Sequence, residues 1–113
     1  MPTWVESIEV IELTADEDKK LTADFTRVIY GDTLATVVSV AETSGLGVTA
    51  SDAAINTGGA IDVDGVSIAT SKALQFMLDC RTATEYGDGV IRVIATTTAG
   101  NRVTLDCRIR VYE

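Results

Sequence analysis

Apolar and polar residues alternate most clearly between Lys72 and Glu113. In the final segment the apolar positions are Val103, Leu105, Cys107, Ile109 and Val111, and the polar positions between them are Arg102, Thr104, Asp106, Arg108, Arg110 and Tyr112. A period of two predicts a half-buried β-strand and excludes a helix. The segments Lys72–Cys80 and Val90–Thr98 alternate in the same way, so we expect two further strands there, joined by turns at Thr84–Gly89 and Ala99–Asn101.

The earlier part of the chain carries weaker versions of this pattern. Ser7–Thr14 predicts a first strand near a sheet edge, and a polar turn over residues 15–20 precedes a second strand in which Leu21, Ala23 and Phe25 alternate with polar residues. A Val- and Thr-rich third strand is expected over Thr33–Thr43, with Leu34, Thr36, Val38 and Val40 in one phase. Residues 44–59 suggest short irregular strands joined by loops.

A β-hairpin is predicted over Ile61–Ile68, because Asp64-Gly65 lies between alternating apolar residues. About seven strands at regular spacing, with no helical period, predict an all-β immunoglobulin-like antiparallel β-sandwich. We expect a single domain over residues 1–113, with residues 1–6 as an extended N-terminal arm.

Composition and charge agree with this class and narrow the partners. Hydrophobic residues make up 46% of the chain and aromatic residues 5%, with the Val, Ile and Thr content typical of strands. The net charge of −8 argues against nucleic acid as a partner. Residues 1–56 carry ten acids and three bases, whereas residues 57–113 carry seven acids and six bases. This asymmetry suits either head-to-tail self-association or a solvated acidic surface.

The opening residues, MPTWVESIEVIEL, lack a basic region followed by an apolar run of signal-peptide length. No stretch approaches the roughly 20 apolar residues of a membrane span. We therefore expect a soluble protein that is made in a cytoplasm and has no membrane partner.

Candidate chemistry is sparse. The chain has no histidine, and the spacing gives its serines and threonines no basic partner, so we expect neither enzymatic activity nor a cofactor. Cys80 and Cys107 fall on the apolar phase of what look like the fifth and seventh strands, which predicts buried free thiols. The disulfide and packed tryptophan of antibody domains are not indicated, since the lone tryptophan is Trp4.

Two acidic stretches could offer oxygen ligands for calcium, Asp62 with Asp64 and the run Asp16–Asp18. Neither matches the EF-hand loop, and turn and capping roles explain these residues, so no metal is expected.

Arginines gather on the outward phase of the last strands. Arg102, Arg108, Arg110 and Tyr112 share one face of the final segment, and Arg92 falls beside them on the preceding one. Arg and Tyr are enriched in protein interfaces. The pattern therefore predicts either a protein-interaction face or cross-strand charge pairs that keep the sheet soluble.

Two segments resemble small phage virion proteins known as fiber-tail adaptors, which have an immunoglobulin-like fold. One runs from Ala15 to Thr26 and continues through Gly31–Thr36, with an acidic turn, an Asp followed by an aromatic residue, and Gly-Asp-Thr before a strand. The other is the Thr-rich hairpin Gly89–Val103 followed by Leu105–Val111. Together the two segments cover about half of the chain.

The resemblance implies a non-enzymatic virion structural protein that joins tail and fiber components through protein contacts. Self-association is also expected, because copies on a virion stabilise one another through many weak contacts. Capsid decoration is the alternative within this class, since head proteins of similar size use such sandwiches. A carbohydrate- or calcium-binding sandwich acting at a host surface is the alternative of another class, with Trp4, Tyr30, Tyr86 and Tyr112 as its aromatic residues.

Overall fold

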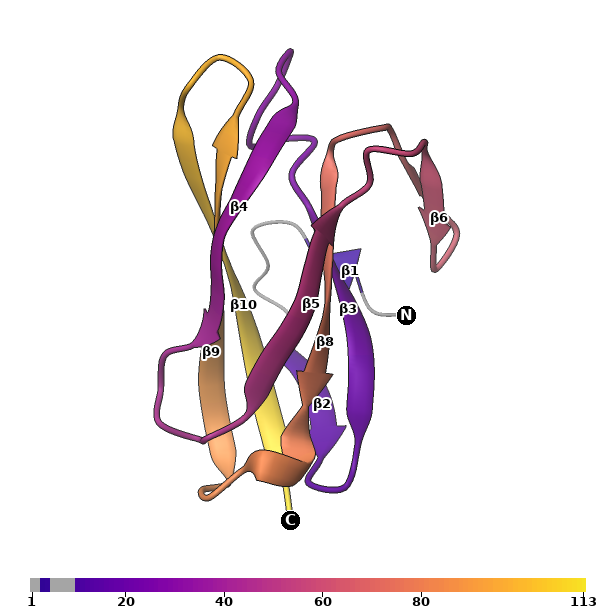
Figure 1. Ribbon diagram of the computed structural model, residues 1–113. Helices are drawn as coiled ribbons and strands as arrows, with labels where there is room; N and C mark the ends of the chain where they lie inside the picture. The colour runs from indigo at the N-terminus through magenta and orange to yellow at the C-terminus, as the bar shows by residue number, and fades with distance from the viewer. Residues whose placement is uncertain (1–2, 5–9) are drawn as a thin grey trace.

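Two four-stranded sheets face each other in the computed structural model, which describes residues 3–4 and 10–113 (Figure 1). The first sheet has the order β1 (Thr3–Trp4), β3 (Asp18–Asp24), β8 (Ala73–Asp79) and β5 (Thr49–Ile55). The second has the order β2 (Val10–Thr14), β10 (Arg102–Tyr112), β9 (Gly87–Thr97) and β4 (Leu34–Glu42). A hairpin of β6 (Ile61–Val63) and β7 (Val66–Ile68) projects beside the first sheet, and a short 3-10 turn, Cys80–Thr82, follows β8.

This strand order is that of an immunoglobulin-like sandwich, as the sequence predicts. The strands β1, β3, β8 and β5 correspond to A, B, E and D of the immunoglobulin fold, and β4, β9 and β10 correspond to C, F and G. The first strand is divided between the sheets, because β1 pairs with β3 and β2 pairs with β10, both in parallel. All other pairings are antiparallel.

The predicted N-terminal features fall partly on residues that the structure does not describe. Of the expected arm over residues 1–6, Thr3 and Trp4 form β1, whereas residues 1–2 and 5–6 lie outside the described residues. The expected first strand is described only from Val10, where β2 begins, because Ser7–Glu9 also lie outside them.

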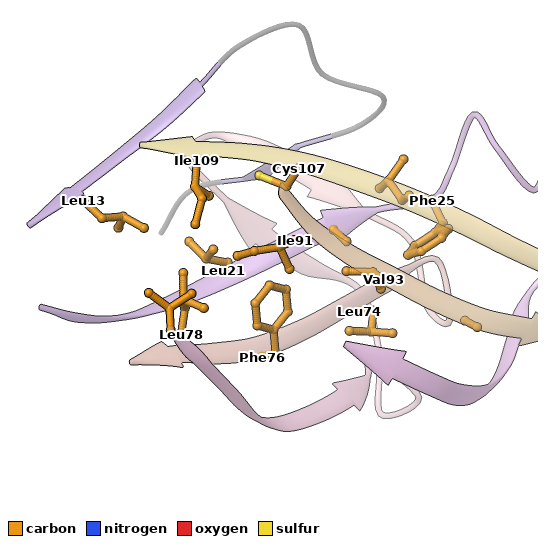
Figure 2. Packing of buried hydrophobic residues seen from close by; sticks show 14 of the residues in the cluster. Leu13, Leu21, Phe25, Leu74, Phe76, Leu78, Ile91, Val93, Cys107 and Ile109 are labelled. Atoms are coloured by element: carbon orange, nitrogen blue, oxygen red, sulfur yellow. The ribbon is translucent and has the colours of Figure 1, made fainter. Parts of the chain in front are cut away.

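Alternate residues of the facing strands meet in one apolar core, as the period of two predicts. Leu74, Phe76 and Leu78 of β8 and Ile91 and Val93 of β9 are all at most 1% exposed. Figure 2 shows the Phe76 ring pointing from β8 toward Ile91 on the opposite sheet. A fully buried side chain of this size stabilises the fold by about 1.5–3 kcal/mol. The core therefore fixes which side of each strand faces solvent.

The predicted phase of the third strand is wrong in the middle of the strand. Leu34 is buried and Val40 packs against the core, as predicted, but Thr36 and Val38 are exposed and Val37 packs against the core instead. The pairing of β4 with β9 shifts register between Leu34 and Thr36 and again between Val37 and Ser39. Such irregularities break a strict alternation and also make an edge strand a poorer template for unwanted pairing.

Several predicted boundaries also move. Residues 49–55 form one edge strand, interrupted by a register shift between Ser51 and Ala54, rather than several short pieces. The second strand begins at Asp18 because it pairs with β8 from Asp79 onward, and β9 begins at Gly87 because it pairs with the end of β10. In contrast, β8 ends at Asp79, so Cys80 begins the 3-10 turn instead of closing the strand.

The predicted hairpin is confirmed. Its strands β6 and β7 pair from Ile61 with Ile68 to Val63 with Val66. Asp64 and Gly65 adopt positive φ angles of 52° and 79°, which is the backbone of a type I′ turn.

The loop between β4 and β5 closes one end of the core over a glycine. The Glu42 carboxylate accepts the backbone N–H groups of Leu46 at 2.8 Å and Gly47 at 3.1 Å. The Leu46 side chain is thereby held against Gly89 of β9, where a Cβ atom would lie 2.6 Å from Leu46 Cδ1 and 3.5 Å from Ile109 Cγ1.

We expect Gly89→Ala to lower the free energy of unfolding by about 1–3 kcal/mol, because the added methyl group overpacks this contact. Urea unfolding followed by circular dichroism measures the change. Gly58→Ala is the matched control, since a Cβ atom at Gly58 meets nothing within 4 Å. Equal stability of the two variants would contradict the packing described here.

Candidate functional site

The five predicted interface residues all lie on the solvent side of the sheet β2-β10-β9-β4. Arg102, Arg108, Arg110 and Tyr112 project from β10, because Leu105, Cys107, Ile109 and Val111 between them point inward and are at most 1% exposed. Arg92 projects from β9 in the same direction, beside Asp106 of β10. We call this surface the arginine face and define it by Arg92, Arg102, Arg108, Arg110 and Tyr112.

Arg92 forms an ion pair with Asp106 within the sheet. Its Nε and Nη2 atoms donate to the two Asp106 carboxylate oxygens at 2.9 and 3.0 Å, since the register places these residues opposite each other. The hydrogen bond from Arg92 lowers the pKa of Asp106, and the carboxylate raises the pKa of Arg92. Both side chains remain more than 40% exposed, so solvent screens the pair and it adds little to the stability of the fold.

Arg110 likewise forms an ion pair, with Asp88. Its Nε atom donates to Asp88 Oδ1 at 2.6 Å across the pairing of β9 with β10. The hydrogen bond from Arg110 lowers the pKa of Asp88, and the positive charge of Arg108 contributes a smaller lowering. Tyr112, the next outward residue, donates its hydroxyl to Glu12 of β2 at 3.2 Å. Neighbouring strands therefore hold three members of the arginine face.

Arg102 and Arg108 differ from Arg92 and Arg110 in their side-chain partners. Both are exposed, and neither forms an ion pair or side-chain hydrogen bond with another residue in the described part of the chain. Arg108 lies between Val90 of β9 and Val10 of β2, which pair with it on either side. Two guanidinium groups of the arginine face thus have no ion-pair or hydrogen-bond partner within the described residues.

Apolar residues that sequence reasoning did not assign to the site lie among these arginines. Val10, Val90 and Ile94 are half-buried on the outward side of the sheet, and Val38 of β4 is 43% exposed. The alternation of β9 could have identified Val90 and Ile94, because they share a phase with Arg92. The exposure of Val38 depends on the register shift in β4 and has no local signal. A surface of this kind combines apolar area with Arg and Tyr, as protein interfaces do.

Nucleophilic chemistry at the cysteines is disfavoured. Cys80 and Cys107 are fully buried and unpaired, as the sequence predicts. Burial raises the pKa of the Cys80 thiol to about 11, with smaller contributions from Glu17 and Asp79, and raises the pKa of the Cys107 thiol to about 12. Both thiols are therefore protonated at neutral pH and lack the thiolate form that attacks substrates.

The acidic residues considered as calcium ligands have other partners or positions. Asp16 and Glu17 accept hydrogen bonds from the Thr14 hydroxyl at 2.7 and 2.8 Å, and Asp18 faces Arg81 at 3.6 Å. Asp64 lies in the β6–β7 turn, far from this acidic run (Figure 1). Within residues 3–4 and 10–113, no three histidine, cysteine or carboxylate side chains are placed to hold a metal ion.

No protein-family model matches the chain, and no curated protein matches it. Among the described residues, no helix has the length and apolar character needed to cross a bilayer.

The cysteine environment yields a direct expectation. In native protein at pH 8, both thiols should react with a chromogenic disulfide reagent at least about a hundredfold more slowly than in urea, because the raised pKa values and burial suppress the thiolate.

The same pKa shifts mean that, as the pH rises, the thiols of the unfolded chain lose their protons before those of the folded protein. The stabilisation linked to the protonated state of the two buried thiols is therefore fully present below pH 9.0, the ordinary pKa of a thiol. It is lost as the pH rises from there to the pKa values of the folded state, about 11 for Cys80 and about 12 for Cys107.

Absorbance during the reaction counts the accessible thiols, and Cys80→Ser and Cys107→Ser identify each one. Rapid native reaction of either cysteine would show that its strand or turn opens readily and would contradict the closed core.

Proposed function

We propose that this chain is a non-enzymatic bacteriophage virion protein, an adaptor that joins tail and fiber components through its arginine face. The single observation that carries the proposal is that the exposed guanidinium groups of Arg102 and Arg108 have no partner among the described residues, with the half-buried Val10 and Val90 on either side of Arg108. The resemblance of the acidic turn and closing hairpin to fiber-tail adaptors supplies the biological setting.

The surrounding ion pairs support a binding role because they leave the face pre-organised. Arg92 is held by Asp106 and Arg110 by Asp88, so these side chains lose little freedom when a partner arrives. Arg102 and Arg108 can then pair with carboxylates of the partner, while Val10 and Val90 exclude water around Arg108. An acidic, partly apolar protein surface is the partner that this arrangement fits best.

An adaptor needs a second contact, and two exposed acidic residues outside the arginine face are the candidates. Asp52 lies at the irregularity of edge strand β5, and Asp62 lies on the projecting β6–β7 hairpin. Both are exposed and have no ion pair within the described residues. These carboxylates could meet a basic surface of another virion protein or the arginine face of another copy. Copies arranged in this way would reinforce one another by multivalency.

Charge reversal tests the arginine face. In phage particles assembled with the variant in place of the wild-type chain, Arg102→Glu together with Arg108→Glu should lower the copies per particle by about tenfold or more, because like charges now oppose the partner. Quantitative immunoblotting of purified particles measures the incorporation. Circular dichroism and thermal unfolding verify that both proteins fold alike.

Lys20→Glu together with Arg27→Glu is the matched control. It changes the net charge by the same amount at two exposed sites off the arginine face, so incorporation should stay near the wild-type level. Equal loss in both double variants would attribute the effect to net charge alone, and normal incorporation of Arg102→Glu/Arg108→Glu would refute the arginine face.

The position of the protein on the particle tests the adaptor role separately. Gold-labelled antibody should mark one vertex or the tail in electron micrographs. Label spread over the head would replace the adaptor role with capsid decoration while leaving the contact face intact.

A further inference from the structure

A pocket of about 260 Å³ is lined by residues of the β3–β4 loop and of β9, β10 and the turn between them. The loop and the turn lie at the same end of the sandwich (Figure 1). Val28 and Ile29 of the loop and Val103 of β10 form its apolar lining. Its polar lining comes from Asp32, Thr97 and Asn101, which are up to 69 residues apart in the sequence. The pocket does not include any residue of the arginine face.

Hydrogen bonds between the β3–β4 loop and the β9–β10 turn fix the position of these two segments in the absence of a ligand. The Thr98 N–H donates to the Thr33 carbonyl at 2.9 Å, and the hydroxyls of the same two residues lie 2.6 Å apart. The loop itself is folded back by the Asp32 N–H, which donates to the Ile29 carbonyl at 2.8 Å. A pre-formed hollow of this kind spares a ligand the entropy of ordering the loops.

Asp32 presents a fixed acceptor to the pocket. Its carboxylate accepts the Thr33 N–H at 2.8 Å. Its pKa is lowered first by the Thr97 hydroxyl, then by the Thr33 and Ala99 N–H groups, and least by the charge of Lys72. Asp32 is therefore ionised at neutral pH and can only accept hydrogen bonds, with lone pairs left over from these donors.

Asn101 and Tyr30 complete the surface. The backbone N–H of Asn101 donates to Thr97 Oγ1 at 3.1 Å, while its exposed side-chain amide has no hydrogen bond to any residue in the described ranges. Tyr30 lines the pocket, yet 93% of it is exposed, far more than Tyr86 at 48% or Tyr112 at 44%. Because almost all of Tyr30 is exposed, its ring is accessible for stacking on a ligand that enters the pocket.

We propose that this pocket binds one ring of a neutral sugar. The C–H face of the ring stacks on Tyr30, and its hydroxyls donate to Asp32 and exchange hydrogen bonds with the Asn101 amide. The volume lies just below the roughly 300–1,000 Å³ of typical small-molecule pockets, so it suits a single ring rather than a longer glycan.

Charge argues against ionic ligands at this position. The Asp32 carboxylate accepts the Thr33 N–H at 2.8 Å, and the Thr97 hydroxyl, the Ala99 N–H and the charge of Lys72 also favour its ionised form, so it does not need a bound cation to stay ionised. An anion would meet the Asp32 carboxylate directly. A neutral polyol satisfies the remaining hydrogen-bonding groups without an ionic mismatch. The proposal stands independently of the virion role, since it concerns a different surface.

Ligand-detected NMR tests the proposal on the full chain. Methyl glycosides of glucose, galactose and mannose, and N-acetylglucosamine, are each offered at millimolar concentration, and saturation transfer from protein to sugar is recorded. We expect transfer to at least one sugar, together with amide shift changes at Asp32, Thr98 and Asn101. Tyr30→Ala and Asn101→Ala should each weaken binding at least about fivefold, a loss typical of one stacking or polar contact.

Two variants keep the result interpretable. Tyr30→Phe retains the stacking surface and should bind nearly as well as wild type, whereas Tyr86→Ala removes an exposed tyrosine outside the pocket and should bind normally. The proposal is overturned if no sugar shows transfer or if Tyr30→Ala binds like wild type. It is also overturned if a cationic probe, a lysine amide with its α-amino group blocked, shifts the amide signals of Asp32, Thr98 and Asn101 and the sugars do not.

Discussion

The contact between the inward sides of β8 and β9 is the constraint on which the rest of the structure depends. Phe76 reaches from one sheet toward Ile91 on the other, and Cys107 and Ile109 extend the same layer along β10 (Figure 2). Because successive side chains of a strand point to opposite sides, burying this set places every arginine of β10 in solvent. The arginine face is thus a geometric consequence of the core, and its five residues lie outside the core cluster.

Register then divides the arginine face into held and free groups. Arg92 meets Asp106 and Arg110 meets Asp88 because each pair is opposed across β9 and β10, whereas Arg108 is opposed by Val90. The held pairs are exposed and contribute little to stability. Their importance lies in limiting side-chain freedom around Arg108, so that a partner meets an ordered surface rather than four mobile side chains.

Irregular segments at the sheet margins serve separate purposes. The register shifts in β4 and β5 interrupt the two strands most open to edge pairing, which favours contacts through faces and loops over strand addition. At the end of the sandwich, the β3–β4 loop and the β9–β10 turn are joined through Thr33 and Thr98. That link holds the loop and the turn together next to the pocket, and the pocket shares no lining residue with the arginine face.

Local pattern alone determined the strand class, the burial of Cys80 and Cys107, the Asp64-Gly65 hairpin and the outward placement of the five arginine-face residues. These follow from the period of side chains along one strand or from the backbone needs of one turn. Tertiary structure decided the exposure of Val38, the pairing that occupies Arg92 and Arg110 but leaves Arg102 and Arg108 free, and the meeting of Tyr30 and Asp32 with Asn101. Those features depend on register and on contacts between residues far apart in sequence, which the alternation within a single strand does not encode.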